Sequence, residues 1–83
     1  MKMFWTRLTL NDRSAIFHQN SACAAIEIDA VIEEKTEELM QHPACGESCM
    51  MEDIYMKDIC LGYVMVYDIA GKHVRILRLL NLS

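Results

Sequence analysis

The last third of the chain has the densest apolar pattern, and this pattern predicts a β-hairpin. Residues 61–70 and 73–80 are rich in valine, isoleucine and leucine, and Asp68 to Gly71 supply turn-forming residues between them. An isolated hairpin is marginally stable in water, so this pair of strands needs a covering layer. Arg75 and Arg78 interrupt the second apolar run, and each should lie at the sheet edge or face a polar site.

The segment from about Ser21 to Gln41 has the spacing of an amphipathic helix. Its glutamates fall opposite the apolar residues, and we interpret them as a solvated surface. His42–Pro43 should end the helix, because proline disfavours a helical conformation in the preceding residue. Spacings of three, four and seven residues define one stripe that should face the core, formed by Ala25, Ile28, Ile32 and Leu39.

The remaining segments complete an α+β pattern. Met3–Leu8 predicts a first strand, with Phe4 and Thr6 on one face and Trp5 on the other. Thr9 or Asn11 should cap a short first helix whose inner side carries Leu10, Ile16 and Phe17. Residues 53–59 predict another strand. We therefore expect a single domain over residues 1–83, in the order β-α-α-β-β-β, with two helices packed on a small, largely antiparallel sheet.

Composition narrows the function classes. The net charge of −4 argues against general nucleic-acid binding, because the molecule as a whole repels polyanions. Apolar runs are far shorter than the roughly 18 residues needed to cross a membrane, and the first residues do not resemble a secretory signal. We expect a cytoplasmic protein whose four cysteines are free thiols.

Cysteine and histidine residues raise the question of metal binding or cysteine catalysis. Cys45 and Cys49, with His42 and Cys60, have ligand types that suit zinc. However, no second close pair follows, and nothing in the spacing brings a histidine to a particular thiol. We therefore expect no metal, no other cofactor and no catalytic cysteine.

The chain resembles the RelE/ParE family of toxins from bacterial type II toxin-antitoxin modules, some of which serve plasmid stabilisation. The resemblance covers nearly the whole sequence. It rests on Trp5-Thr6 with Leu10 and Asp12 shortly after, on the block from Ala24 to Asp29, on His42-Pro43 with Gly46, and on Gly62-Tyr63, Tyr67, Gly71 and Val74 to Leu80, the most specific part. It implies the RelE/ParE-like fold and a cognate antitoxin as protein partner, in a toxin-antitoxin hetero-oligomer.

The family divides mainly into ribosome-dependent messenger-RNA endonucleases and inhibitors of DNA gyrase. The nuclease branch needs several Arg or Lys residues and a proton donor around one phosphate. The resemblance places part of that machinery after the final strand, where this sequence reads Asn81-Leu82-Ser83, and the loop after Pro43 carries Glu47 in place of basic residues. These departures favour a ParE-like toxin that binds gyrase and is not an enzyme. A RelE-like nuclease and a non-toxic relative that keeps antitoxin binding stay as alternatives.

Five side chains are candidates for partner contact: Arg75, Arg78, Tyr63, Tyr67 and Trp5. The planar guanidinium groups suit a carboxylate or a phosphate, although both arginines are also compatible with a solvated strand. Three positions apart on a regular strand, they should point to opposite faces. Tyr63 and Tyr67 should share one face, either stacking on a partner or packing with a solvated hydroxyl.

Overall fold

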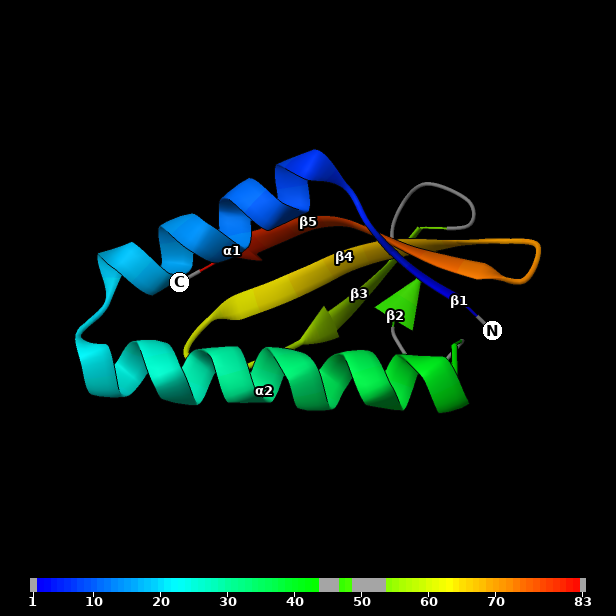
Figure 1. Ribbon diagram of the computed structural model, residues 1–83. Helices are drawn as coiled ribbons and strands as arrows, with labels where there is room; N and C mark the ends of the chain where they lie inside the picture. The colour runs from blue at the N-terminus through cyan, green and yellow to red at the C-terminus, as the bar shows by residue number, and fades with distance from the viewer. Residues whose placement is uncertain (1, 44–46, 49–53, 83) are drawn as a thin grey trace.

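The computed structural model describes residues 2–43, 47–48 and 54–82. Its elements, shown in Figure 1, are the strands β1 (Lys2–Trp5), β2 (Glu47–Ser48), β3 (Ile54–Asp58), β4 (Tyr63–Ala70) and β5 (His73–Asn81), and the helices α1 (Arg7–Gln19) and α2 (Ala22–Gln41). The predicted order β-α-α-β-β-β is confirmed for the longer elements. The two-residue strand β2 is an addition that the sequence pattern did not indicate.

The strands form one mixed sheet in the order β1-β5-β4-β3-β2. Only β1 and β5 pair in parallel; every other neighbouring pair is antiparallel, as expected for a largely antiparallel sheet. The first strand of the chain therefore lies beside the last one. This pairing brings α1, which follows β1 directly, alongside the second half of β5.

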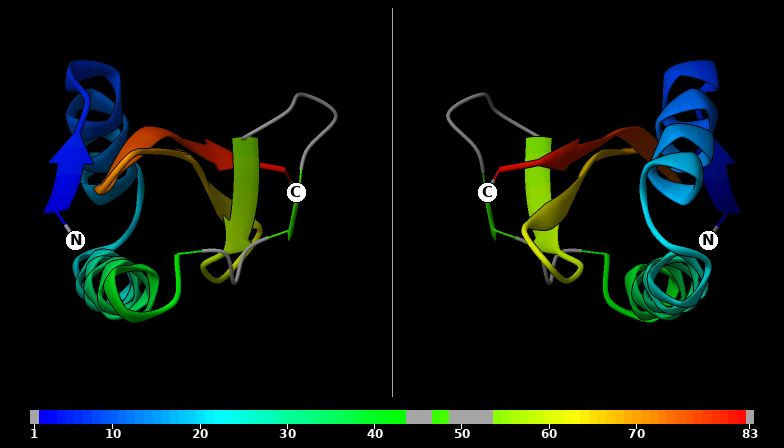
Figure 2. Two further views of the ribbon diagram at one scale, coloured as in Figure 1. Left: turned by 90° about the vertical axis from the view of Figure 1, so that its right-hand side faces the viewer. Right: turned by 90° about the vertical axis from the view of Figure 1, so that its left-hand side faces the viewer.

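The core lies between the sheet and the two helices, which occupy the same side of it (Figure 2). The predicted stripe of α2 is confirmed, since Ile28, Ile32 and Leu39 are almost completely buried. Ser21 caps the helix by accepting a hydrogen bond from the backbone of Ala24, and Pro43 follows its end. The sheet contributes the buried side chains Tyr63, Met65, Tyr67, Val74, Ile76 and Leu79.

The boundary between β1 and α1 corrects the sequence prediction. Met3–Leu8 is not one strand: β1 ends at Trp5, and Thr6 caps a helix that already contains Arg7 and Leu8. The strand propensity of the Trp5-Thr6 pair is outweighed because the Thr6 hydroxyl accepts a hydrogen bond from the backbone N–H of Thr9. Leu10 and Phe17, expected inside, are exposed, and Ile16 is the buried apolar residue of this helix.

The turn of the hairpin is shorter than predicted. Strand β4 continues to Ala70 and pairs it with His73, so Gly71 and Lys72 alone form the loop. Gly71 has φ +60°, as the first loop position of a type II′ turn requires. Asp68, expected in the turn, is a strand residue opposite Arg75.

A β-bulge in β5 changes which side chains share a face. Val66 pairs with Arg78 and Tyr67 pairs with Ile76, so Leu77 is an extra residue on β5. Because of this residue, Arg75 and Arg78 stand opposite Asp68 and Val66, two positions of the same face of β4. The expectation that the two arginines point to opposite faces is therefore wrong.

Candidate partner-binding face of the sheet

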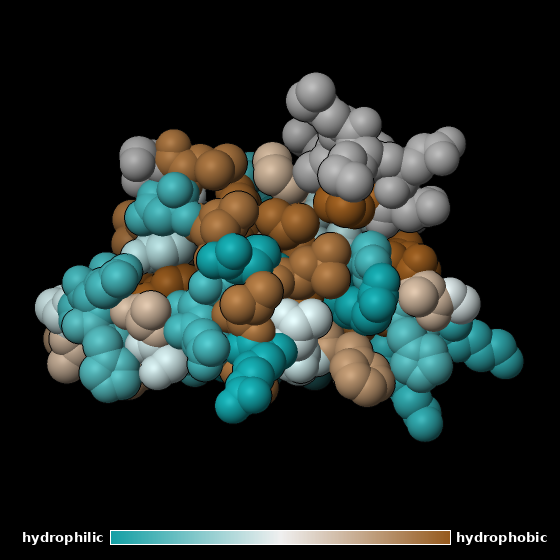
Figure 3. Space-filling view, turned by 90° about the horizontal axis from the view of Figure 1, so that it is seen from above, coloured by the Kyte–Doolittle hydropathy of each residue, from teal (hydrophilic) through white to brown (hydrophobic). Residues whose placement is uncertain are grey.

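The outer sheet face, which points away from the helices, combines apolar side chains with the two arginines. By strand register, Phe4, Arg75 and Asp68 lie at one end of this face, and Val66 and Arg78 lie nearer its middle. Half-buried apolar side chains complete it: Ile54, Met56 and Leu80. Seen from above, apolar side chains gather in a central band (Figure 3). An open hollow of about 350 Å³ lies at the hairpin end, lined by Phe4, Ala70, His73 and Arg75.

Arg75 is held by the carboxylate opposite it. Its Nε donates to Asp68 Oδ1 at 2.9 Å, and its Nη2 donates to Asp68 Oδ2. This hydrogen-bonded pair raises the pKa of the Arg75 guanidinium. The Asp68 side chain is largely covered whereas half of Arg75 is exposed, so the guanidinium keeps an open side toward solvent.

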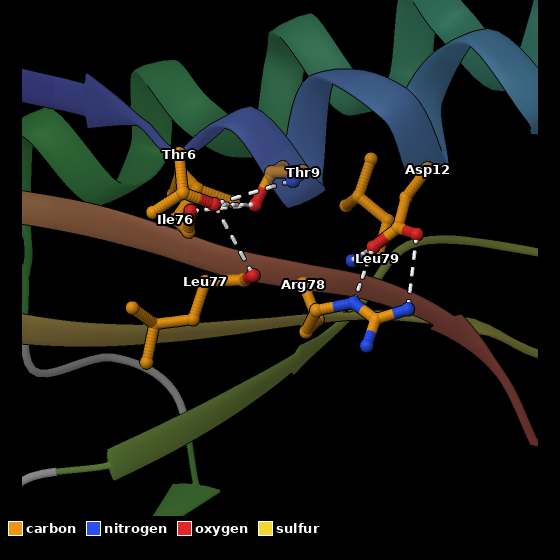
Figure 4. Close-up of polar contacts among 7 residues, drawn as sticks. All are labelled: Thr6, Thr9, Asp12, Ile76, Leu77, Arg78 and Leu79. Carbon is orange, nitrogen blue, oxygen red and sulfur yellow. Dashed lines mark hydrogen bonds and ion pairs between the residues drawn. The ribbon is translucent and has the colours of Figure 1, made fainter.

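Arg78 makes the equivalent pair with helix α1 (Figure 4). Its Nε and Nη2 donate to the two carboxylate oxygens of Asp12 at 2.7 and 3.1 Å. Asp12 Oδ2 also accepts a hydrogen bond from the backbone N–H of Leu79 at 3.1 Å. The bond from Arg78 is the main cause that lowers the pKa of Asp12, with the Leu79 N–H adding to it against the opposing effect of burial.

Side chains of α1 replace a neighbouring strand along the second half of β5. Beyond Trp5 there is no β1 residue to pair with β5, and three polar side chains at three-residue spacing take its place (Figure 4). The buried Thr9 hydroxyl donates to the carbonyl of Ile76 at 2.6 Å, and Thr6 Oγ1 donates to the carbonyl of Leu77 at 3.3 Å. With Asp12 on the Leu79 N–H, these contacts satisfy backbone groups that an open sheet edge would leave to water.

The predicted aromatic residues occupy the opposite side of the sheet. Tyr67 is fully buried, stacks on Tyr55 with ring centroids 5.4 Å apart, and donates its hydroxyl to the carbonyl of Pro43. Tyr63 is also buried, and its hydroxyl accepts a hydrogen bond from Asn20. Trp5 is half-buried against the core. Both tyrosines are therefore packing residues in this structure, and Arg75 and Arg78 are the predicted residues that reach the surface.

The structure shows contacts of Asp12, Asp68 and Thr9 that the sequence did not predict. Asp12 and Asp68 fix the two arginines, and Thr9 fixes α1 to β5. The three-residue spacing of Thr6, Thr9 and Asp12 was a usable signal, because such positions advance along one side of a helix. The sequence prediction placed Thr6 in a strand and Thr9 at a helix cap, so this spacing was not read as one side of a helix.

Two observations in the described ranges bear on metal binding and on thiol chemistry. Within residues 2–43, 47–48 and 54–82, no three His, Cys, Asp or Glu side chains gather closely enough to hold a metal ion. Cys23 and Cys60 are free thiols, whereas Cys45 and Cys49 lie outside the described residues. Neither helix has the length and hydropathy needed to cross a membrane.

We expect the ion pairs that Asp12 and Asp29 make to give the fold a specific pH dependence. Hydrogen bonds from Arg78 and Arg13 hold the pKa of each carboxyl below its ordinary value of about 3.9. A carboxyl with a lowered folded-state pKa stabilises the fold above its unfolded pKa, and this contribution is lost as the pH falls through the folded value. Asp12→Asn should therefore lower the urea midpoint at pH 6, and this deficit should shrink as the pH falls through the folded-state pKa of Asp12.

The matched control is Glu34→Gln, since Glu34 is exposed and has no ion pair among the described residues. Urea unfolding of both variants and the wild type at pH 6 and pH 2 gives the comparison. An Asp12→Asn deficit of equal size at both pH values would contradict an ionic origin.

The fold and the side-chain contacts between α1 and β5 define a small α+β domain with a helical hairpin packed on a mixed sheet. The chain belongs to the ParE toxin family of type II toxin-antitoxin systems, parDE, whose family model matches residues 3–82. None of the curated proteins matches it in sequence.

Solved structures share the fold at low identity. A chain of the chromosomal ParDE toxin-antitoxin system from P. aeruginosa has a TM-score of 0.87 at 20% identity, covering 100% of this chain and 97% of that one. A YoeB/ParE toxin from Agrobacterium tumefaciens has a TM-score of 0.76 at 15% identity, covering both chains completely. The YoeB dimer from Staphylococcus aureus has a TM-score of 0.72 at 15% identity, over 94% of this chain and 92% of that one.

Proposed function

We propose that this protein is the toxin component of a type II toxin-antitoxin module, that it is neutralised by a cognate antitoxin, and that it inhibits DNA gyrase by protein-protein binding in the cytoplasm. Membership of the ParE toxin family is the observation that carries the proposal. The structural likeness to a chain of a ParDE system supports an antitoxin partner.

The outer sheet face is the surface we assign to the antitoxin. In the apolar band of this face, Phe4 is exposed by 60% and Val66 and Leu80 are half-buried, and Leu82, which follows β5, is exposed by 62%. Apolar side chains gathered on one face of a small domain are typical of a protein-binding site. Arg75 keeps half of its side chain exposed beside this band, where a carboxylate of the partner can reach it. Trp5, Tyr63 and Tyr67 support this face from the core side.

The ion pairs of Arg75 and Arg78 favour a toxin that binds a protein over a toxin that cleaves RNA. Cleavage of a messenger needs cations that converge on one phosphate, and on this face both Arg75 and Arg78 already form two-bond contacts with carboxylates. The sequence from Ala44 to Asp53 contains no lysine or arginine that could add to them. A phosphate held between the two guanidinium groups would compete with Asp68 and Asp12 for them.

A RelE-like messenger-RNA endonuclease is the second candidate. Its specific support is the structural likeness to two toxins described as YoeB or YoeB/ParE. That likeness, at 15% identity, concerns the fold alone. A non-toxic relative that keeps antitoxin binding is the third reading.

Controlled expression in bacterial cells separates these functions. We expect growth arrest with filamentation and DNA damage while incorporation of labelled amino acids continues at first. Purified toxin should inhibit supercoiling of relaxed plasmid by gyrase, and co-expression with the product of the neighbouring reading frame should restore growth. Immediate loss of protein synthesis with cleaved messenger would favour the nuclease, and unaffected growth would favour the non-toxic relative.

A further inference from the structure

The helical hairpin carries a second exposed apolar surface, separate from the outer sheet face. Leu10, Phe17 and Ile26 are exposed by 52%, 46% and 63%. We name these three residues the hairpin patch. On α1, Thr9, Asp12 and Ile16 face the sheet and the core, and at about 100° per residue Leu10 and Phe17 lie roughly a quarter of a turn away from them.

An ionic clamp joins the two helices next to the hairpin patch. Arg13 Nε donates to Asp29 Oδ1 at 2.7 Å, and its Nη2 donates to Glu33 Oε1 at 2.6 Å. Leu10 and Phe17 stand three before and four after Arg13, so they share its face of α1. Ile26 stands three before Asp29 and shares the face of α2 that meets Arg13. The helices run antiparallel (Figure 1). Phe17, which follows Arg13, and Ile26, which precedes Asp29, therefore lie toward the loop between the helices, and Leu10 lies on the other side of the clamp.

The clamp is rigid and leaves negative charge at the surface. The Arg13 guanidinium also lies 5.0 Å from the centre of the Trp5 ring, which ties both helices to β1. One guanidinium faces two carboxylates here, and Glu27, Glu34 and Glu37 are exposed on α2 without an ion pair among the described residues. The patch is therefore an apolar centre beside an acidic helix.

This charge distribution selects the kind of partner. A second copy would bring the same acidic helix to the contact, so like charges would oppose each other. A protein that acts on DNA carries basic surface for the phosphate backbone, which complements apolar and acidic side chains. An antitoxin segment on the outer sheet face leaves the hairpin patch uncovered unless it extends across α1, about 10 Å in diameter.

We propose that the hairpin patch and the acidic side of α2 form the target-binding surface of this toxin and dock on a basic protein surface of the DNA-handling enzyme that it inhibits. This inference rests on the proposed gyrase-directed function. It assigns that function to side chains of α1 and α2, and it leaves the outer sheet face to the antitoxin.

Gyrase supercoiling assays with the purified full-length toxin test the proposal. The double variant Phe17→Ser/Ile26→Ser should raise the half-inhibitory toxin concentration about tenfold or more, because truncating central apolar anchors removes much of the binding energy of an interface. Glu34→Lys/Glu37→Lys should weaken inhibition as well, and inhibition by the wild type should decline with added salt. All four positions are exposed, and thermal unfolding verifies that the variants are folded.

Leu8→Ser is the matched control, because Leu8 is exposed by 58% but belongs neither to the hairpin patch nor to the outer sheet face. It should inhibit gyrase like the wild type. Wild-type inhibition that both double variants retain in full would overturn the inference while leaving the proposed function intact. A wild-type protein without effect on gyrase would overturn the proposed function, and the inference with it.

Discussion

Tyr67→Ala should destabilise the protein by about 3–5 kcal/mol, in the range found for truncating a buried aromatic side chain. Tyr67 is fully buried at the centre of the sheet, stacks on Tyr55, and joins β4 to the chain after α2 through its hydroxyl. A chain of 83 residues has a free energy of unfolding of about 4–12 kcal/mol. The substitution therefore removes a large part of the total, and urea unfolding at pH 7 measures it.

Tyr67→Phe is the control for this prediction. It keeps the stacked ring and removes the hydrogen bond to the Pro43 carbonyl, so the expected loss is about 1 kcal/mol. If Tyr67→Ala costs no more than Tyr67→Phe, the ring is not the central packing element that the structure indicates.

Thr9→Val should destabilise the protein by about 1–3 kcal/mol, although the two side chains have almost the same shape. The Thr9 hydroxyl is fully buried and bonds both to the Ile76 carbonyl, at 2.6 Å, and to the Thr6 hydroxyl, at 2.7 Å. Removing it takes away a short hydrogen bond between α1 and β5. Hydrogen exchange should report faster exchange in the second half of β5, and urea unfolding gives the loss of stability.

Thr36→Val is the matched substitution in α2. Among the described residues, the Thr36 hydroxyl bonds only to the carbonyl of Glu33 in its own helix, so its loss should cost less and should leave exchange in β5 unchanged. Thr9→Ser keeps the hydroxyl and should recover most of the protection of β5. Equal effects of the two valine variants on β5 would refute the bridging role of Thr9.

The fold was predictable in segments whose apolar pattern fits one kind of secondary structure only. The stripe of α2 and the alternation in the hairpin each required burial on a single side, and both elements formed as expected. The first ten residues were less predictable, because Thr6 has both strand propensity and a side chain that caps helices. The cap is decided by tertiary contacts with β5, which the local sequence does not contain.

For the candidate site, the sequence indicated two surface arginines but not their geometry. Arg75 and Arg78 were identified as exceptions in an apolar strand, and both are at the surface. Their common face depends on the extra residue Leu77, and a bulge has no strong signal in a run of leucines and isoleucines. Tyr63 and Tyr67 were correctly placed on one face, but only the structure shows that helices cover it.

Because α1 covers the edge of β5, a partner strand cannot pair with that part of the sheet. Backbone-mediated β-augmentation requires an edge with free N–H and C=O groups. Along β5 beyond Trp5, those groups are occupied by Thr6, Thr9 and Asp12. Among the described strands, the outer edges that remain are β1, β2 and the part of β3 that β2 does not pair with. A partner that contacts the second half of β5 must therefore read side chains, so specificity there can change through surface substitutions that leave the strand pairing untouched.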